Sequence, residues 1–269
     1  GCGILRFTVL MSIYSEECPE YLTRSLRSLV NQTLKADEVV LVEDGPIPEE
    51  LQLVIEHFKE KLNIKSVKLE KNRGLAVALN EGLKYCSNEL IARMDTDDIS
   101  LPHRFEKQVA FMKAHPEVAV SSAFIEEVSE TNQTLSIRKL PLVHEELLYF
   151  AKTRCPITHP VSIFRKSAVL SVGGYPDLKK AQDAALWSLM LQHGFRFANL
   201  DEVLLKMFIG KEFFNRRSLE HLRYELAALN FQRQIGFITW PIFFKNVVIR
   251  LILRLSPVYI KQLLYKYAR

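Results

Sequence analysis

The sequence predicts an α/β fold in which a mostly parallel sheet is flanked by helices. Up to Phe124, short runs of β-branched and other apolar residues alternate with longer segments of helical periodicity. Proline stands in the first turn of three of these helical segments, where its missing N–H leaves no helical hydrogen bond unmade. This alternation is typical of parallel strands, because each intervening helix returns the chain to the same end of the sheet.

The expected elements follow in chain order. Strands are expected at residues 7–13, 38–42, 66–69, 90–94 and 118–123, and helices at 19–31, 48–59, 75–85 and 102–114. Beyond Phe124 the alternation weakens. There the pattern predicts a polar connection or hairpin at 129–139 and helices at 144–152, 166–172 and 182–192, the last ending at His193-Gly194.

Composition favours an ordinary globular chain. With 269 residues and 48% hydrophobic content, it can bury one large core, or one core plus an appendage. Its four cysteines, Cys2, Cys18, Cys86 and Cys155, are scattered without metal-ligand spacing, which favours free thiols in a reducing compartment. No signal peptide is evident, and no apolar run reaches the roughly 18 to 20 residues that span a bilayer. We therefore expect a cytoplasmic location.

The charge is unevenly distributed and suggests two parts, a main domain at 1–205 and a basic, amphipathic helical extension at 206–269. The second part has 12 basic and 3 acidic residues, a net +9, whereas the first has 24 and 28, a net −4. Apolar residues are interleaved with the basic ones and no nucleic-acid module is recognisable, which favours an anionic membrane surface over nucleic acid as the partner. The alternative is a C-terminal helix packed on the domain with its charges in solvent.

Three carboxylates, Asp95, Asp97 and Asp98, crowd together directly after the strand expected at 90–94. Such a cluster repels itself unless a cation organises it, and hard divalent cations prefer oxygen ligands. The spacing indicates a divalent metal that holds a nucleotide diphosphate. The alternative is a loop in which aspartate caps the helix that opens near Pro102.

Polar residues also follow the other expected strands. Ser12 and Tyr14 end the first strand, Glu43 and Asp44 end the second, and Arg73 follows the third. In open α/β sheets, ligands bind outside the carboxyl ends of the strands, so these side chains are expected to share one edge with the aspartates. An aromatic ring, a carboxylate and an arginine there suit a nucleotide.

At this point the chain resembles the inverting glycosyltransferase family numbered 2, of the GT-A fold, and especially its bacterial surface-polysaccharide members. The matching blocks run over nearly the whole length: Thr8 to Tyr14, Val42 to Gly45, Asn72 to Ala76, Met94 to Asp98, His159-Pro160, Phe164 to Lys166, Gly173 to Tyr175, Gln182 to Trp187 and Ala198 to Leu200. The resemblance implies a Rossmann-like, mostly parallel sheet flanked by helices.

The resemblance also implies roles for individual residues. Ser12, Tyr14 and Asp44 would hold the nucleoside, with Arg73 close by. Asp97 would be the direct ligand to Mg or Mn, Asp95 would lean toward the ribose or donor sugar, and Asp98 would orient its neighbours or ligate in place of Asp97. The general base of the family falls on Asp183.

The chemistry agrees with a single base, because displacement at an anomeric carbon needs proton removal from the acceptor hydroxyl and stabilisation of the leaving diphosphate. Asp183 would supply the first and the metal the second, although Asp183 also suits the N-cap of the helix at 182–192. Trp187, one turn later, is a candidate for contact with the acceptor sugar or for the core. His159 is a candidate for the sugar-binding wall or for a hydrogen-bonded loop position.

Three departures from the family pattern stand out. Glu43-Asp44 replaces Asp-Asp, and Gln182-Asp183 replaces the usual Glu-Asp. Met207 to Gly210 replaces a stretch that carries a diphosphate-gripping His or Arg; the possible substitutes are Lys206, Lys211, Arg216 and Arg217. The Gln-x-x-Arg-Trp signature of processive synthases is absent, so one sugar per encounter is expected.

Together these observations predict a metal-dependent, inverting, non-processive glycosyltransferase. It would move a sugar from a UDP- or GDP-sugar to a glycan or lipid-linked acceptor during synthesis of exopolysaccharide, capsule or O-antigen. Its expected place is the inner face of the plasma membrane, as a peripheral protein. The alternative is a non-catalytic nucleotide-sugar-binding or membrane-scaffolding protein. A nucleotidyltransferase is disfavoured, because no glycine-rich loop follows Val9.

Overall fold

The computed structural model describes residues 6–210, 219–257, 260 and 263. Among these residues, nine strands form one sheet in the order β3-β2-β1-β4-β8-β6-β9-β5, with β7 added beside β6. The first part of this sheet is parallel: β1 (Phe7–Ile13) lies between β2 (Glu38–Glu43) and β4 (Leu90–Arg93), and β3 (Ile64–Lys68) pairs with β2. The predicted α/β class and its mostly parallel sheet are confirmed.

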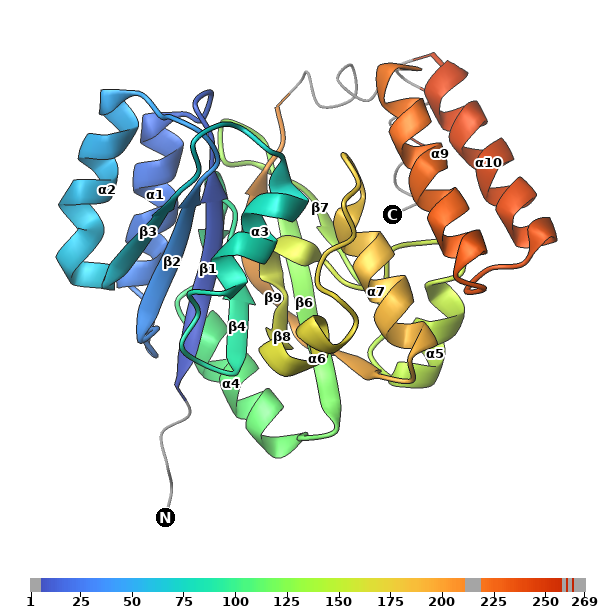
Figure 1. Cartoon of the computed structure of the whole chain (residues 1–269), viewed down its shortest axis with the longest axis horizontal. Coiled ribbons are helices and arrows are strands. Elements are labelled where there is room, and N and C mark those ends of the chain that lie inside the picture. The colour runs from blue at the N-terminus through green and yellow to red at the C-terminus, as the bar shows by residue number, and fades with distance from the viewer. Residues whose placement is uncertain (1–5, 211–218, 258–259, 261–262, 264–269) are drawn as a thin grey trace.

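Helices cover both faces of the sheet (Figure 1). On one face α1 (Pro19–Val30), α2 (Glu49–Leu62) and α4 (Arg104–Ala114) pack on a core that includes Val9 and Met11 of β1. On the other face α3 (Leu75–Leu83) packs on a second core that includes Leu10. Because successive side chains of a strand point to opposite faces, a strand buried on both faces is apolar almost throughout, as β1 is.

The second half of the sheet is mixed. The long strand β6 (Val118–Val128) pairs in parallel with β9 (Arg196–Phe208) and antiparallel with β8 (Ile163–Arg165). It also pairs antiparallel with β7 (Thr134–Arg138), so residues 129–139 form the hairpin that was one of the two expectations. The two-residue strand β5 (Ile99–Ser100) closes the sheet by pairing with β9. Strands β5, β8 and β9 were not predicted.

The expected helices of the second half are present as α5 (His144–Phe150), α6 (Lys166–Ser171) and α7 (Gln182–Gln192), with a 3₁₀ turn, η1 (His159–Val161), before β8. Strand β9 runs to Phe208 and so crosses the boundary expected after residue 205. The division into two parts stays a prediction.

Two further helices, α9 (Leu219–Gln234) and α10 (Trp240–Leu255), lie side by side at one end of the molecule (Figure 1). Gln232 of α9 donates a hydrogen bond of 2.7 Å to the Ser188 hydroxyl of α7, which ties the pair to the sheet-bearing part. Of the basic stretch at 258–269, only Ile260 and Leu263 are described. Within the described ranges, no helix is both long enough and apolar enough to cross a membrane.

Candidate active site

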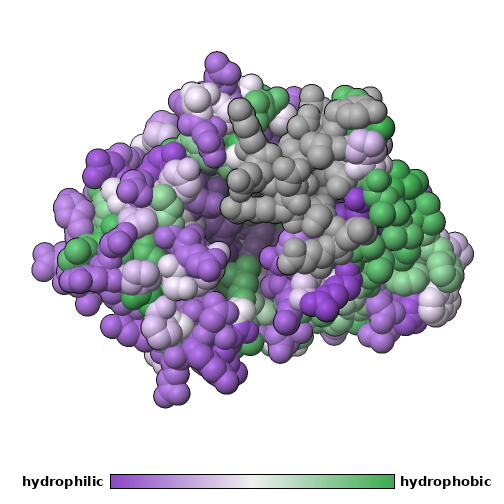
Figure 2. All heavy atoms as spheres, turned by 90° about the horizontal axis from the view of Figure 1, so that it is seen from above, coloured by the Kyte–Doolittle hydropathy of each residue, from purple (hydrophilic) through white to green (hydrophobic). Residues whose placement is uncertain are grey.

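The carboxyl ends of β1, β2 and β4 meet at one edge of the sheet, as their parallel register requires. Figure 2 looks onto this end of the molecule, where hydrophilic side chains surround a hollow. The residues at these strand ends therefore come together: Ser12 near the end of β1, Tyr14 after it, Asp44 after β2, and the aspartates after β4. The sequence prediction of a shared edge holds for all of them.

The three aspartates form a tight carboxylate cluster. One carboxylate oxygen from each of Asp95, Asp97 and Asp98 lies within 4.8 Å of the other two. Burial raises the pKa of Asp98 well above its usual value, and the charges of Asp95 and Asp97 act in the same direction. The pKa of Asp97 is also raised, by desolvation first and by Asp95 second.

One oxygen of this cluster, Oδ2 of Asp98, is buried without a hydrogen-bond partner. A buried carboxylate oxygen that accepts no hydrogen bond is costly, and a cation is the partner that removes the cost. Three hard oxygen donors at this separation are the ligand chemistry that Mg and Mn prefer. The residues present therefore fit a divalent cation.

Two buried arginines form hydrogen bonds that hold Asp95 and the neighbouring backbone in place. Arg93, the last residue of β4, donates hydrogen bonds to Asp95 Oδ1 at 2.9 Å, to the Met94 carbonyl at 3.2 Å and to the Leu10 carbonyl. Arg104 donates to the Arg93 carbonyl at 2.8 Å, and burial followed by the nearby Arg93 charge lowers its pKa to about 9. Sequence reasoning missed both, although an arginine at the end of an apolar strand is a visible signal.

A fourth carboxylate, Glu17, borders the cluster. The Thr96 hydroxyl donates to Glu17 Oε2 at 2.8 Å, which places this carboxylate beside the loop of the aspartates. Burial raises the pKa of Glu17 to about 7, and the charges of Asp97 and Asp95 add to that effect. Glu17 was not predicted as a site residue, because nothing in the sequence links the loop after β1 to residue 96.

Asp44 holds the loop that opens α3. Its Oδ1 accepts the backbone N–H of Arg73 at 2.7 Å and its Oδ2 accepts that of Gly74 at 3.1 Å. The adjacent Gly45 has a φ of +89°, and a Cβ there would lie 2.7 Å from the Asn72 nitrogen. Only glycine allows this close approach of two backbones. The carboxylate expected to contact the nucleoside is thus also the clamp of the Arg73 loop.

The other nucleotide candidates surround this clamp. Tyr14 is 41% exposed, Ser12 is half-buried and the side chain of Arg73 is exposed. Glu43 is buried, its Oε1 accepts a 2.7 Å hydrogen bond from Gln52, and its Oε2 has no partner. The structure brings these residues to one edge, and their roles toward a nucleotide stay predictions.

Asp183 lies in the first turn of α7. The N-cap of this helix is Ala181, in the left-handed region with a φ of 56°, so Asp183 is not the cap. Burial raises the pKa of Asp183, whereas the backbone N–H groups of Ala184 and of Asp183 itself, and the charge of Arg138, act in the opposite direction. The Asp95 charge is close enough to raise this pKa further. The Cys155 thiol lies 3.8 Å from Asp183 Oδ2, and the role of Asp183 as a base stays a prediction.

His159 belongs to a buried hydrogen-bond chain. Its Nε2 accepts from Arg93 Nε at 3.1 Å and lies 2.8 Å from the Tyr175 hydroxyl. Burial and the Arg93 charge lower the pKa of His159 well below its usual value, so the imidazole is neutral. Asn80 of α3 holds Tyr175 through two backbone hydrogen bonds, of 2.8 and 2.9 Å. His159 thus supports Arg93, as expected for a hydrogen-bonded loop position. A contact of His159 with a sugar stays a prediction.

The expected acceptor contact of Trp187 is corrected by the structure. Its side chain is fully buried and packs edge-on against His159 and Phe197, with ring centroids 5.9 and 6.0 Å away. A side chain without exposed surface offers no face to a sugar. Trp187 is a core residue that lies behind His159, which was the second of its two sequence interpretations.

Substitute cations for the missing late motif are expected at 206–217. Lys206 of β9 pairs with Ile99 and lines a surface hollow with Arg24 and Phe208, near the aspartates. Arg24 stacks on the Phe208 ring at 3.6 Å and donates to the Asp97 carbonyl at 3.4 Å. Arg24 is therefore a cation at the cluster that sequence reasoning missed. The other candidates, Lys211, Arg216 and Arg217, lie outside the described residues.

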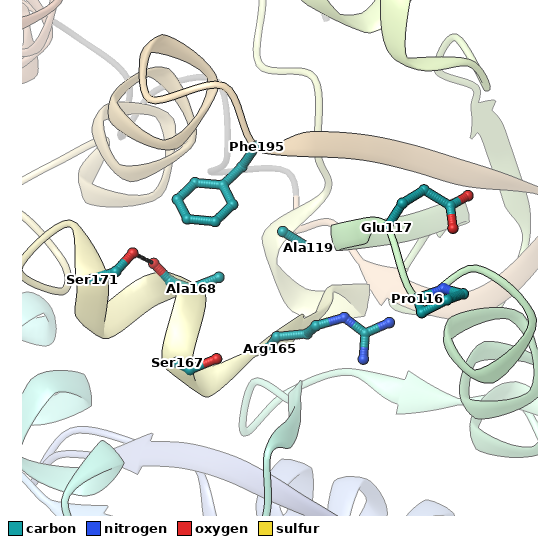
Figure 3. A pocket seen from close by; sticks show the side chains of 8 residues that line it. All are labelled: Pro116, Glu117, Ala119, Arg165, Ser167, Ala168, Ser171 and Phe195. Atoms are coloured by element: carbon teal, nitrogen blue, oxygen red, sulfur yellow. Dashed lines mark hydrogen bonds between the residues drawn. The ribbon is translucent and has the colours of Figure 1, made fainter.

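A second hollow lies at the opposite end of β4, where Arg165 pairs with Leu90 (Figure 3). Its one arginine, Arg165, donates to the backbone carbonyls of Val118, Met112 and His115. Because the guanidinium is engaged by the backbone, this hollow offers no comparable set of groups for a ligand. The chemistry of the molecule is concentrated at the carboxyl edge.

Comparisons with known proteins show the family of the chain. Residues 8–172 match the model of the family described as glycosyl transferase family 2. The chain is 41% identical over 264 residues to the amylovoran biosynthesis glycosyltransferase AmsE of Erwinia amylovora, which covers 97% of this chain and 98% of that protein. It is 34% identical over 262 residues to the UDP-Gal:alpha-D-GlcNAc-diphosphoundecaprenol beta-1,3-galactosyltransferase of Escherichia coli, which covers 97% and 95%.

Among solved structures, the fold is similar to that of the mannosyltransferase PcManGT from Pyrobaculum calidifontis in complex with GDP-Man and Mn2+. The TM-score is 0.65 at 16% identity, and the match covers 98% of this chain and 79% of that one. This is a likeness of fold. It confirms the predicted GT-A-like fold.

The family match and these relatives identify the chain as a glycosyltransferase, an enzyme that takes a sugar from a nucleotide-sugar donor. The chain belongs to glycosyl transferase family 2, with relatives that serve bacterial surface-polysaccharide biosynthesis. The resemblance inferred from the sequence blocks is thereby confirmed.

Proposed function

We propose that this protein is a metal-dependent, inverting glycosyltransferase that adds one sugar at a time to a growing surface polysaccharide. The observation that carries the proposal is the cluster of Asp95, Asp97 and Asp98, whose oxygens lie within 4.8 Å of one another and include an unpartnered buried oxygen. A divalent cation held by such a cluster would allow an anionic diphosphate to bind next to the carboxylates.

In this proposal Asp97, Asp95 and Asp98 would hold a Mg or Mn ion, which would neutralise charge on the leaving diphosphate. Asp183 takes the proton of the acceptor hydroxyl as that oxygen bonds to the anomeric carbon. The bond from the anomeric carbon to the diphosphate oxygen breaks in the same displacement, so the product has the opposite anomeric configuration. Arg93 fixes Asp95, and neutral His159 fixes Arg93.

The donor is proposed to be a UDP- or GDP-sugar, with Ser12, Tyr14, Asp44 and Arg73 around the nucleoside. The Escherichia coli relative is named for UDP-Gal and the Pyrobaculum neighbour was solved with GDP-Man and Mn2+, which supports both nucleotides and the metal. The acceptor is proposed to be a glycan or a lipid-linked sugar, since the name of the same relative specifies a diphosphoundecaprenol. A lipid-linked acceptor would place the protein peripherally on the inner face of the plasma membrane.

The test is titration calorimetry of UDP and GDP with and without Mn, followed by transfer assays with lipid-linked acceptors and NMR of the anomeric proton in the product. Metal-dependent binding with transfer and inversion is the expected result. Binding without any transfer across donors and acceptors would favour a non-catalytic nucleotide-sugar-binding protein. Retention of the donor configuration would contradict the single displacement.

A further inference from the structure

The helix α10 presents its apolar side chains to the outside. Its outward residues recur every three or four positions, which places them on one face of the helix. Each is between 52% and 65% exposed: Trp240, Phe244, Val248, Ile252 and Leu255. Figure 2 shows the corresponding hydrophobic area at the end of the molecule formed by α9 and α10.

The inward face of the same helix is partly polar. Asn246 is buried and its Nδ2 donates to the Lys152 carbonyl at 2.9 Å. Arg254 is buried and donates from Nε to Glu225 of α9 at 3.1 Å. Leu253 of the same helix is buried as well, so α10 is apolar on both its inward and its outward side, whereas a helix on a water-exposed surface is normally polar on its outer face. The outward stripe therefore needs an apolar environment that the described chain does not supply.

Charge indicates which environment that is. After Glu225 the sequence has no acidic residue, but it has seven basic ones: Arg233, Lys245, Arg250, Arg254, Lys261, Lys266 and Arg269. Lys245 is exposed on α10 itself, and the Arg233 guanidinium lies 4.1 Å from the centre of the Trp240 ring. Apolar and aromatic side chains flanked by cations are the composition of helices that lie in the headgroup region of anionic bilayers.

We infer that the outward face of α10 docks on an anionic lipid bilayer, with the helix axis parallel to the surface. The inference rests on the membrane location proposed above and assigns it to this face. At 16 residues the helix is about 24 Å long, shorter than the ~30 Å hydrocarbon core, so it lies in the interface and does not span it. Figure 2 shows the hollow at the carboxyl edge and the hydrophobic area in one view.

The experiment measures sedimentation of the full chain with vesicles of phosphatidylcholine and phosphatidylglycerol, and with vesicles of phosphatidylcholine alone. The test variant carries Phe244→Gln, Val248→Gln and Ile252→Gln. The control variant carries Leu53→Gln, Tyr149→Gln and Leu170→Gln, which replace side chains that are 63%, 84% and 49% exposed on α2, α5 and α6. We expect the test variant to lose at least about tenfold in partitioning to anionic vesicles and the control to bind like the parent.

Fluorescence adds a readout that needs no variant. The sequence has two tryptophans, of which Trp187 is fully buried and Trp240 is on the docking face. Brominated lipids quench on contact, so we expect quenching of the exposed tryptophan fraction only.

The outcomes separate the two proposals. If the parent binds anionic vesicles and the test variant binds equally, the α10 face is wrong and the membrane location stands. If the parent binds no vesicles, the location itself is wrong. A parent dimer that the test variant converts to monomer in sedimentation without lipid, together with no vesicle binding, would assign the face to a second copy of the chain.

Discussion

Arg93 and Asp95 lie two residues apart at the carboxyl end of β4, and the guanidinium of the first donates a 2.9 Å hydrogen bond to Oδ1 of the second. Arg93 is fully buried, whereas the Asp95 side chain is 40% exposed, so the pair joins the core to the site. Charge-assisted hydrogen bonds from a buried arginine fix the orientation of a carboxylate. The aspartate cluster is thus positioned before any ligand arrives.

Replacement of Arg93 should therefore affect both folding and nucleotide binding. We expect Arg93→Met to lower the free energy of unfolding by about 3–5 kcal/mol, because it leaves its buried partners unpaired. Arg93→Lys, which keeps the charge, should fold better and still weaken metal-dependent binding of UDP or GDP. Urea unfolding and calorimetry measure the two effects.

The matched control is Arg165→Met, because Arg165 also donates to backbone carbonyls but lies at the other end of β4. It should destabilise the fold and leave nucleotide affinity unchanged. Equal nucleotide affinity in the parent and Arg93→Lys would show that Arg93 serves folding alone.

The metal site predicts a second result. Asp97→Asn and Asp98→Asn should each remove the dependence of nucleotide binding on Mn, since each loses one anionic ligand of a three-carboxylate site. Both variants should be at least as stable as the parent without metal, because burial and mutual repulsion raise the pKa of both groups. Asp201→Asn, an exposed position on β9, is the control. Unchanged affinity of Asp97→Asn after chelation of metal would refute the assignment.

The raised pKa of Glu17 predicts a pH dependence of stability. Its ordinary value is 4.5 and its folded value is about 7, so between these pH values the folded state holds a proton that the unfolded state has lost. The free energy of unfolding without metal should accordingly fall as the pH rises through this window and level off above it. Asp97 and Asp98 act in the same direction.

Urea unfolding in EDTA across this range measures the slope. Glu17→Gln should reduce it by up to one proton, and Glu16→Gln, an exposed neighbour, should leave it unchanged. A Glu17→Gln protein with the parent slope would mean that Glu17 ionises normally in the fold.

Much of the first half of the fold was predictable, because its strands are buried on both faces and are read directly as apolar runs. The predicted bounds of β1 agree with the structure at both ends. Strand β9 was missed because Asn199, Asp201 and Glu202 interrupt its apolar pattern, and its pairing with β6 contains register shifts. Strands β5 and β8 have two and three residues, too few for periodicity to show.

The residues of the candidate site also differ in whether the sequence alone could predict them. The aspartates and Asp183 lie in local sequence blocks, so the sequence alone was enough to propose them as site residues. Glu17, Arg24 and Arg93 act through partners that the chain brings near only when it folds, such as Thr96 for Glu17. Trp187 was given a possible acceptor role because helical spacing places it one turn from Asp183, but spacing does not determine which face of a helix is buried.

The last prediction concerns Asp183. Asp183→Asn keeps the size of the side chain but removes the basic oxygen, so kcat should fall by about 100- to 10,000-fold. Affinity for nucleotide and Mn should change little, because Asp183 lies on α7 and the cluster follows β4. In the parent, kcat should fall as the pH drops through the pKa of Asp183, which burial raises above its usual value. Transfer assays across pH and calorimetry on the same preparations measure both quantities.

Asp177→Asn, exposed and six residues earlier, is the control. If Asp183→Asn transfers sugar at the parent rate while Asp177→Asn or a His159 variant does not, the base is one of those residues.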